Sequence, residues 1–182
     1  MYWWLHFIEE YNGISMIKTC QWSEPDVFFS TDACLVGVGG INNSEFFHRR
    51  IPEFIQNKAL GIVHFECLAI MLAIKVWSHL WHGNKISIYC DNEAVCHIIN
   101  SGKTKEPVLL SFIREVAYYA CTREFEIRVI HLSSEDNRLT DTLSRWHVQS
   151  EADIKCFYEN TGLSADCEVH IPDNLFLIEN DW

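Results

Sequence analysis

The sequence predicts a mixed α/β fold, in which one sheet is covered by helices. Segments with the alternation or the bulky residues of strands take turns along the chain with segments that have the composition of helices. Such interleaving is typical of a sheet with helices packed on its faces. The chain has 182 residues, of which 48% are hydrophobic and 21% charged, and this suits one globular domain with some extension.

The first predicted elements are a hairpin, a third strand and a buried helix. Residues 26–40, DVFFSTDACLVGVGG, begin with bulky strand formers and end in glycines, which indicate a hairpin or a bulge. Residues 44–51, SEFFHRRI, are the returning strand. Residues 65–80 contain no Gly or Pro and are apolar on most of their circumference, so we predict a buried helix that ends near HGN, residues 82–84.

A strand and two helices follow. KISIYC, residues 85–90, is a short strand, and the next segment is a short helix for which Asn92 suits the N-cap and Gly102 the end. Pro107 suits the first turn of a second helix, which continues through residues 108–123.

The last predicted elements are a strand and a short helix. Residues 124–132, EFEIRVIHL, alternate in the manner of a strand, and LTDTLSRW, residues 139–146, forms a helical turn or two. After His147 the chain becomes acidic and irregular. We expect this last part to be either an extension packed on the domain or a linker.

The charge and the cysteines limit the classes of partner and compartment. The formal net charge of −11 argues against a nucleic-acid partner, because Lys and Arg normally hold polyanions. A local basic patch, or divalent cations that bridge carboxylates to phosphates, would reverse that conclusion. The eight cysteines are scattered singly, without C-x-x-C pairs, which predicts buried thiols rather than disulfides or a zinc site.

Membrane and targeting signals are not evident. No apolar run approaches the length that crosses a bilayer, so we expect no membrane partner. The N-terminal MYWWLHFIEE is apolar but has neither a basic leader nor a small-residue cleavage site, so we interpret it as an amphipathic helix or the cut end of something longer. The expected location is the cytoplasm, with the nucleus as an alternative.

Four acidic residues occupy comparable places in this layout, each among mostly apolar neighbours. They lie in the first strand, at the start of the apolar helix, at the end of the middle strand and in the last helix: Asp32, Glu66, Asp91 and Asp141. A lone buried carboxylate is costly unless it is paired or bound to a metal. A convergent group would need cations, and Mg²⁺ or Mn²⁺ suits an all-carboxylate site better than zinc does.

Each acid also has a structural alternative. Asp32 would satisfy backbone donors at a bulge, and Glu66 would favour the first turn of its helix electrostatically. Asp91 would cap the helix that begins beside it, and Asp141 would pair with Arg145 at i+4. A structural role for all four together is less plausible than for any one, because an α/β sheet brings these elements to one place.

The residues around these acids resemble a known family. STDACLVGVGG, ECLAIMLAIKVW, IYCDNEAVCHIINSGK and HLSSEDNRLTDTLSRW resemble, in order, the four catalytic blocks of ribonuclease H domains attached to retrotransposon reverse transcriptases. The ending N-x-x-x-D-x-L-S-R-W is particularly close to DIRS-type (tyrosine-recombinase) retroelements. The upstream WWLHFIEEYNGISMI is similar to the segment that joins their polymerase to their ribonuclease H.

The resemblance implies a fold, an activity and a cofactor. The fold is ribonuclease H-like, a five-stranded mixed sheet flanked by helices. The activity is endonucleolytic hydrolysis of the RNA strand of RNA–DNA hybrids. The cofactor is a pair of Mg²⁺ ions, with Mn²⁺ as a substitute, and the implied ligands and catalytic residues are Asp32, Glu66, Asp91 and Asp141.

The resemblance also divides the chain and names its partners. Residues 1–24 would be the tail of the polymerase or connection segment, residues 25–148 the ribonuclease H-like domain, and residues 149–182 an acidic C-terminal extension. The implied partners are the RNA–DNA hybrid and a polymerase domain missing from this chain.

Several residues are candidates for contacts with nucleic acid. Asn92 is either a minor-groove donor to RNA 2′-hydroxyls or only a helix N-cap. Arg49 and Arg50, on the returning strand, are placed to touch phosphates or to protect a solvated edge strand. Lys103 and Lys105 are the only cations in SGKTKEP, where some cellular enzymes have a basic protrusion.

One departure from the family pattern concerns the loop that leads to Asp141. Many relatives have a Pro-Gly turn where this chain has Ser133-Ser134, and we expect the serines to loosen that loop.

A second function class stays open beside the enzyme. The acidic charge and the absent basic protrusion favour a non-catalytic nucleic-acid or protein-interaction module derived from a decayed retroelement. The four intact acids favour the nuclease.

Overall fold

The computed structural model describes residues 5, 7–9 and 22–178, and the fold is built from the last of these ranges. Of the N-terminal segment predicted as an amphipathic helix, residues 5 and 7–9 are described and are helical, whereas most of the segment assigned to the polymerase connection lies outside the described residues. The proposed division of the chain at residues 25 and 149 stays a prediction.

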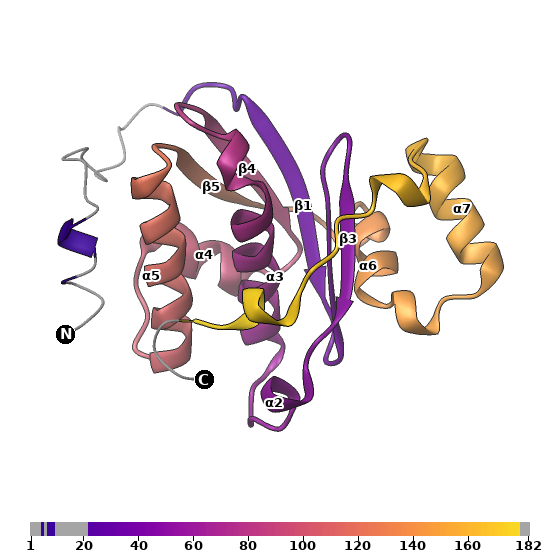
Figure 1. The fold of residues 1–182 in the computed structure, drawn as a ribbon, viewed down its shortest axis with the longest axis horizontal. Helices are drawn as coiled ribbons and strands as arrows, with labels where there is room; N and C mark the ends of the chain where they lie inside the picture. The colour runs from indigo at the N-terminus through magenta and orange to yellow at the C-terminus, as the bar shows by residue number, and fades with distance from the viewer. Residues whose placement is uncertain (1–4, 6, 10–21, 179–182) are drawn as a thin grey trace.

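A five-stranded mixed sheet forms the centre of the fold (Figure 1), as predicted. Its order is β3-β2-β1-β4-β5. Strand β2 is antiparallel to both β1 and β3, whereas β4 is parallel to both β1 and β5. The strands are Val27–Ala33 (β1), Gly37–Ile41 (β2), Phe46–Arg50 (β3), Lys85–Cys90 (β4) and Glu126–His131 (β5).

Helices cover both faces of this sheet. The central helix α3 and its neighbour α5 lie on one face, and α6 packs on β2 and β1 from the other. Adjacent residues of β3 show the two faces, because Phe47 joins the core beside α3 while Phe46 packs against α6 and α7. The helices are Glu53–Gln56 (α2), Ile62–Trp77 (α3), Glu93–Ser101 (α4), Pro107–Thr122 (α5), Arg138–Ser144 (α6) and Glu151–Thr161 (α7).

The helix signals in the sequence are confirmed around α4 and α5. The side chain of Asn92 caps α4 by accepting hydrogen bonds from the backbone N–H groups of Ala94 and Val95. Gly102 ends that helix in the left-handed conformation, with φ at 65°. Pro107 occupies the first turn of α5.

The hairpin predicted over residues 26–40 is confirmed as β1 and β2, although the glycines of residues 37–40 do not form its turn. They form strand β2 itself, while the hairpin turn lies at residues 34–36. A Cβ atom at Gly37 would collide with the backbone of Ser144, and one at Gly39 with Leu143. These two glycines therefore let α6 lie directly on the strand next to β1.

The C-terminal extension is more regular than expected. The prediction of an irregular segment was wrong for residues 151–161, which form α7 behind a capping box of Ser150 and Asp153. This S-x-x-D signal was present in the sequence. Figure 1 shows the described part of the extension passing from α7 across β3 toward α3 and α5.

The extension is packed on the domain rather than separated from it as a linker. Phe157 of α7 meets Phe46 at a ring distance of 5.1 Å. The N–H of Val169 donates to the carbonyl of Phe46 at 2.7 Å, so the extension adds a short parallel contact to the edge of the sheet. Lys75 of α3 then holds the carbonyl of Leu177 at 2.6 Å.

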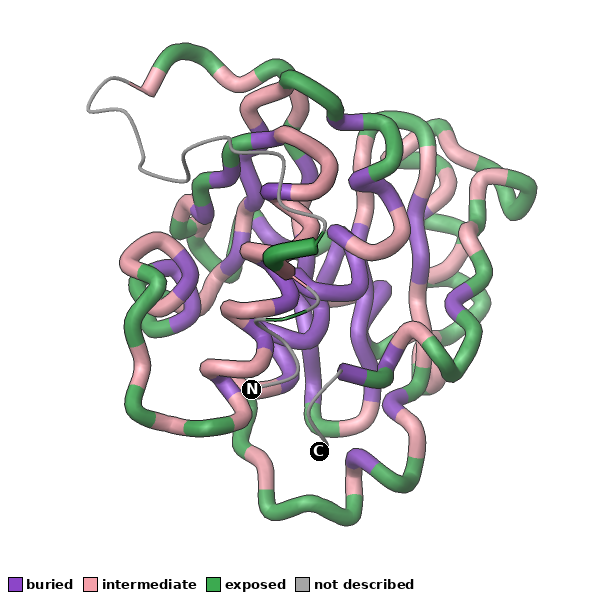
Figure 2. The backbone as a smooth tube through the Cα atoms, turned by 60° about the vertical axis from the view of Figure 1, so that its left-hand side comes forward, coloured by how far each residue is buried: buried purple, intermediate pink, exposed green. Residues whose placement is uncertain are grey.

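Burial is concentrated in the strands and α3 (Figure 2). Contrary to the expectation from sequence, the helical stretch Ile62–Leu80 is long and apolar enough by length and composition to cross a membrane. However, 67% of that window is buried inside the fold, as in the core helix of a globular protein. Five of the seven cysteines in the described part of the chain are buried, and all seven are free thiols.

Candidate active site

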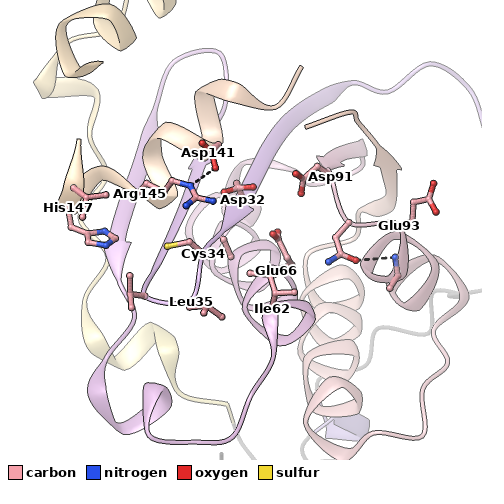
Figure 3. A pocket seen from close by; sticks show the side chains of 15 residues that line it. Asp32, Cys34, Leu35, Ile62, Glu66, Asp91, Glu93, Asp141, Arg145 and His147 are labelled. Atoms are coloured by element: carbon pink, nitrogen blue, oxygen red, sulfur yellow. Dashed lines mark hydrogen bonds and ion pairs between the residues drawn. The ribbon is translucent and has the colours of Figure 1, made fainter. Parts of the chain in front are cut away.

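The four predicted carboxylates line one cleft of about 900 Å³ at the end of the sheet. Figure 3 shows Asp32, Glu66, Asp91 and Asp141 turned toward a shared space from four different elements. The cleft is thus acidic at its centre, and its rim includes the exposed apolar side chains of Leu35 and Val148.

Asp32 lies at the centre of the group and has one unpaired oxygen. Its Oδ1 accepts a hydrogen bond of 3.4 Å from Nδ2 of Asn137, which also reaches the carbonyl of Thr31. Its Oδ2 is buried and has no hydrogen-bond partner, although the residue is only 4% exposed. A buried carboxylate oxygen without a donor is costly unless a cation completes it.

Glu66, in the second turn of α3, is also buried, at 3% exposure. The thiol of Cys90 donates to its Oε2 at 3.8 Å. Burial raises the pKa of Glu66 to about 9, with further contributions from the charges of Asp32 and Asp91. Burial likewise raises the pKa of Asp32 to about 7, and the charges of Asp91 and Asp141 add to it, while the hydroxyl of Ser144 and the charge of Arg145 act in the opposite direction. The carboxylates of the cleft therefore repel one another when they are ionised.

Asp91 follows the last residue of β4 and is half-buried. It does not cap α4, because Asn92 does so. Instead, Oγ of Ser134 donates to its Oδ2 at 2.8 Å. Ser133 bonds Asp136 at 2.6 Å, so both serines of this loop make hydrogen bonds. The expectation that the serines loosen the loop was wrong, since Ser134 ties the loop to the site.

Asp141 reaches the group because α6 packs closely on the glycines of β2. Its Oδ1 accepts from Nε of Arg145 at 2.7 Å, so the i+4 pair suggested by the sequence is present. Both partners are about half exposed, and Asp141 still faces the cleft. The pairing is therefore compatible with a second role for this carboxylate.

The donor set fits a hard divalent cation. Oxygens of Glu66 and Asp91 and the sulfur of Cys90 lie within 4.8 Å of one another. A hydrogen bond with Cys96, together with burial, raises the pKa of the Cys90 thiol, which therefore keeps its proton. The ligands that remain are carboxylate oxygens, the type preferred by Mg²⁺ and Mn²⁺. The unpaired carboxylate oxygen of Asp32 would also suit Mg²⁺ or Mn²⁺.

The predicted nucleic-acid residues are not gathered in one place. Asn92 lines the cleft and caps α4 through its Oδ1, while its amide nitrogen has no hydrogen-bond partner among the described residues. Arg49 is bound to Asp173 of the extension at 2.9 Å, and Arg50 is exposed beside it. Lys103 and Lys105 lie between α4 and α5 and do not line the cleft.

Sequence reasoning missed three residues that the structure places at the site. Asn137 and Ser134 hold Asp32 and Asp91, and His147 lies at the rim of the cleft (Figure 3). Asn137 belongs to the quoted N-x-x-x-D ending, which was the available signal for it. The sequence marked Ser134 only as a departure from the family pattern in its loop and did not mark His147, because the neighbours of both residues come from other elements.

The comparison with protein families identifies the domain. Residues 24–119, more than half of the chain, match the family described as the RNase H-like domain found in reverse transcriptase. The chain belongs to this family. The match includes the strands and helices that carry Asp32, Glu66 and Asp91.

Solved structures agree on the ribonuclease H-like fold. The RNase H1 of the halophilic archaeon Halobacterium salinarum NRC-1 is 16% identical, with a TM-score of 0.50 over 64% of this chain and 92% of that one. The foamy viral protease-reverse transcriptase in complex with RNA/DNA hybrid is 12% identical, with a TM-score of 0.52. This match covers 74% of the present chain and 22% of the viral chain. The comparison with curated proteins finds no match.

Proposed function

We propose that this ribonuclease H-like domain hydrolyses the RNA strand of RNA–DNA hybrids as part of a retroelement reverse transcriptase. The observation that supports it most is the convergence of four carboxylates from four elements on one cleft, with an unpaired buried oxygen on Asp32. The two structural neighbours, an archaeal RNase H1 and a reverse transcriptase bound to RNA/DNA hybrid, are consistent with this substrate.

The proposed ligands of two Mg²⁺ ions, or of Mn²⁺, are Asp32, Glu66, Asp91 and Asp141. Ions held in this way supply activation of water and stabilisation of the leaving 3′ oxygen at phosphorus. The chain itself provides the geometry. Asn137 fixes one oxygen of Asp32 and leaves the other free, while Ser134 orients Asp91. Arg145 limits the repulsion around Asp141.

Recognition of the hybrid requires a group that distinguishes RNA from DNA. Asn92 lies beside Asp91 at the cleft, and its side-chain Nδ2 is not used by the cap. We assign it as a donor to a 2′-hydroxyl in the minor groove. Lys103 and Lys105, which are exposed in the next loop, would reach only a more distant part of the hybrid.

The source and setting of the domain are further proposals. The N-x-x-x-D-x-L-S-R-W ending supports a DIRS-like element, in which a polymerase domain would deliver the hybrid. Action in the cytoplasm, or in the nucleus, follows from such an origin.

A second candidate is a non-catalytic interaction module. The net charge of −11 favours it, as does the pairing of Arg49 with Asp173, because both reduce the attraction for a polyanion. In this case the cleft would bind cations without cleaving nucleic acid.

Cleavage of an end-labelled RNA–DNA hybrid at low salt separates the two. RNA, DNA and RNA–RNA duplexes of the same sequence are run beside it, with Mg²⁺ and then Mn²⁺. The proposal predicts cuts in the RNA strand of the hybrid alone. A folded, metal-binding chain that leaves every duplex intact would contradict the nuclease and favour the module.

A further inference from the structure

A second cavity lies next to the acidic cleft, on the other side of the segment that follows α6. It has a volume of about 270 Å³ and lies between β3, the residues after α6 and the C-terminal extension. The lining of this cavity is mainly basic, whereas that of the cleft is mainly acidic. The basic side chains include His48, Arg49, Arg50 and His147. His147 lines both spaces and therefore stands at the border between them.

The extension already compensates part of this basic group. His48 is 3.2 Å from Glu168, and Arg49 is 2.9 Å from Asp173. In contrast, neither Arg50 nor His147 forms an ion pair within the described part of the chain. These two residues are exposed or half-exposed at the border between the cavities.

Arg145 extends this border toward the carboxylates. Only its Nε is used in the pair with Asp141, so its outer nitrogens face the cleft without a hydrogen-bond partner among residues 22–178. Figure 3 shows Arg145 between Asp141 and His147. The order along the border is thus carboxylates, Arg145, His147 and Arg50.

The border is held in place by aromatic packing. Trp146, between Arg145 and His147 in the chain, stacks on the ring of His48 at 4.6 Å and lies 5.4 Å from Phe157 of α7. The side chains on either side of it are therefore displayed from a fixed backbone rather than from a free loop.

The cations repel one another. The pKa of His147 is lowered by burial and further by the charges of Arg50 and Arg145. A cluster of like charges is relieved when an anion is placed among them. Guanidinium groups suit phosphate in particular, because their planar fork donates two parallel hydrogen bonds.

We propose that Arg50, His147 and the outer nitrogens of Arg145 form a subsite for a backbone phosphate of the bound nucleic acid. This inference rests on the proposed function, since the subsite would hold the strand that enters the carboxylate cleft. It separates the two arginines of β3: Arg50 contacts the ligand, whereas one outer nitrogen of Arg49 is already bound to Asp173 of the extension. Phosphate contacts position a strand and make its binding depend on salt.

The test measures binding rather than cleavage. Asp91→Asn in the full chain serves as the parent, so that the hybrid stays intact. Fluorescence anisotropy of a labelled RNA–DNA hybrid in Mg²⁺ gives Kd over a series of KCl concentrations. Arg50→Gln is compared with Lys155→Gln, which removes one charge from an exposed residue of α7 that lines neither cavity.

The proposal predicts that Arg50→Gln weakens binding about fivefold to tenfold and lowers the slope of log K against log salt by about 1. Arg50→Lys keeps most of the slope, and His147→Gln weakens binding about twofold to fivefold. Lys155→Gln leaves the slope as in the parent. Circular dichroism melting checks that each variant is folded.

Equal slopes for Arg50→Gln and the parent, or equal losses for Arg50→Gln and Lys155→Gln, would overturn the subsite. A parent that does not bind the hybrid would overturn it as well. The nuclease is judged separately with the unmodified chain: cleavage with an unchanged Arg50→Gln slope refutes the subsite alone. Binding that depends on Arg50 without any cleavage refutes the nuclease alone.

Discussion

The two sides of α6 differ in how their charges are compensated. On the side of β3, basic side chains meet acids of the extension, as in the pairs His48–Glu168 and Arg49–Asp173. On the side of the cleft, Asp32 and Glu66 are buried without a basic partner within hydrogen-bonding distance in the described range. Charge that the chain compensates itself has a structural use, and charge left uncompensated marks where a ligand binds.

The largest effect on cleavage is expected when one carboxylate charge is removed from the cleft. We expect Asp91→Asn to reduce hybrid cleavage by about three orders of magnitude or more, since it deletes a proposed metal ligand. The fold should persist, because the two side chains have nearly the same volume. Asp173→Asn, which removes a compensated acid on the other side of α6, should retain cleavage in the same gel assay.

The pH dependence of stability reports on the two buried carboxyl groups of the cleft. The pKa of Asp32 is raised to about 7 and that of Glu66 to about 9, so both lie above the values in an unfolded chain. Without metal, stability from these groups is fully present below about pH 4 and is lost as the pH rises through 7 and then 9.

Urea denaturation in a chelator should therefore show a fall of several kcal/mol in the free energy of unfolding between pH 5 and pH 9, because each group loses about 1.4 kcal/mol per pH unit up to its folded pKa. Asp32→Asn should remove the part of this fall that lies between pH 5 and about pH 7. A wild-type stability that rises over this range would contradict the account of uncompensated burial.

The contact that brings Asp141 to the cleft is tested at β2. Gly39→Ala would place a Cβ against Leu143, and we expect it to cost about 1–3 kcal/mol and to lower cleavage by displacing α6. Gly61→Ala is the matched control, because a Cβ there meets no atom within 4 Å. Equal stability of the two variants in thermal melts would show that α6 does not depend on the glycine.

The smallest expected effect concerns Ser134. Ser134→Ala removes the hydrogen bond of 2.8 Å to Asp91 and should weaken Mg²⁺ binding about twofold to fivefold, measured by calorimetry. Ser133→Ala, in the same loop but bonded to Asp136, should leave the Mg²⁺ affinity unchanged. A larger loss in Ser133→Ala would assign the effect to loop order rather than to orientation of Asp91.

Much of the fold could be predicted because its signals are local. The caps at Asn92 and Gly102, and Pro107 at the first turn of α5, each act through neighbouring backbone groups. The capping box of Ser150 and Asp153 was equally local and was overlooked because the composition around it is acidic.

The site could be predicted in outline and not in detail. Asp32 and Asp91 stand at strand positions that an α/β sheet brings together, so their convergence follows from topology. The role of Gly39 in seating α6, and the tie from Ser134 to Asp91, depend on contacts between segments distant in the sequence. No periodicity or local motif encodes such contacts.

Thermal melting with and without Mg²⁺ at pH 8 shows whether the uncompensated carboxylates of the cleft accept a cation. A free Mg²⁺ concentration of about ten times Kd should stabilise the chain by about 1.4 kcal/mol, with a smaller effect at pH 6, where protons compete. The shift should vanish in Asp32→Asn. Melting that is unchanged by Mg²⁺, or equally shifted in wild type and Asp32→Asn, would contradict the claim that these carboxylates bind a cation.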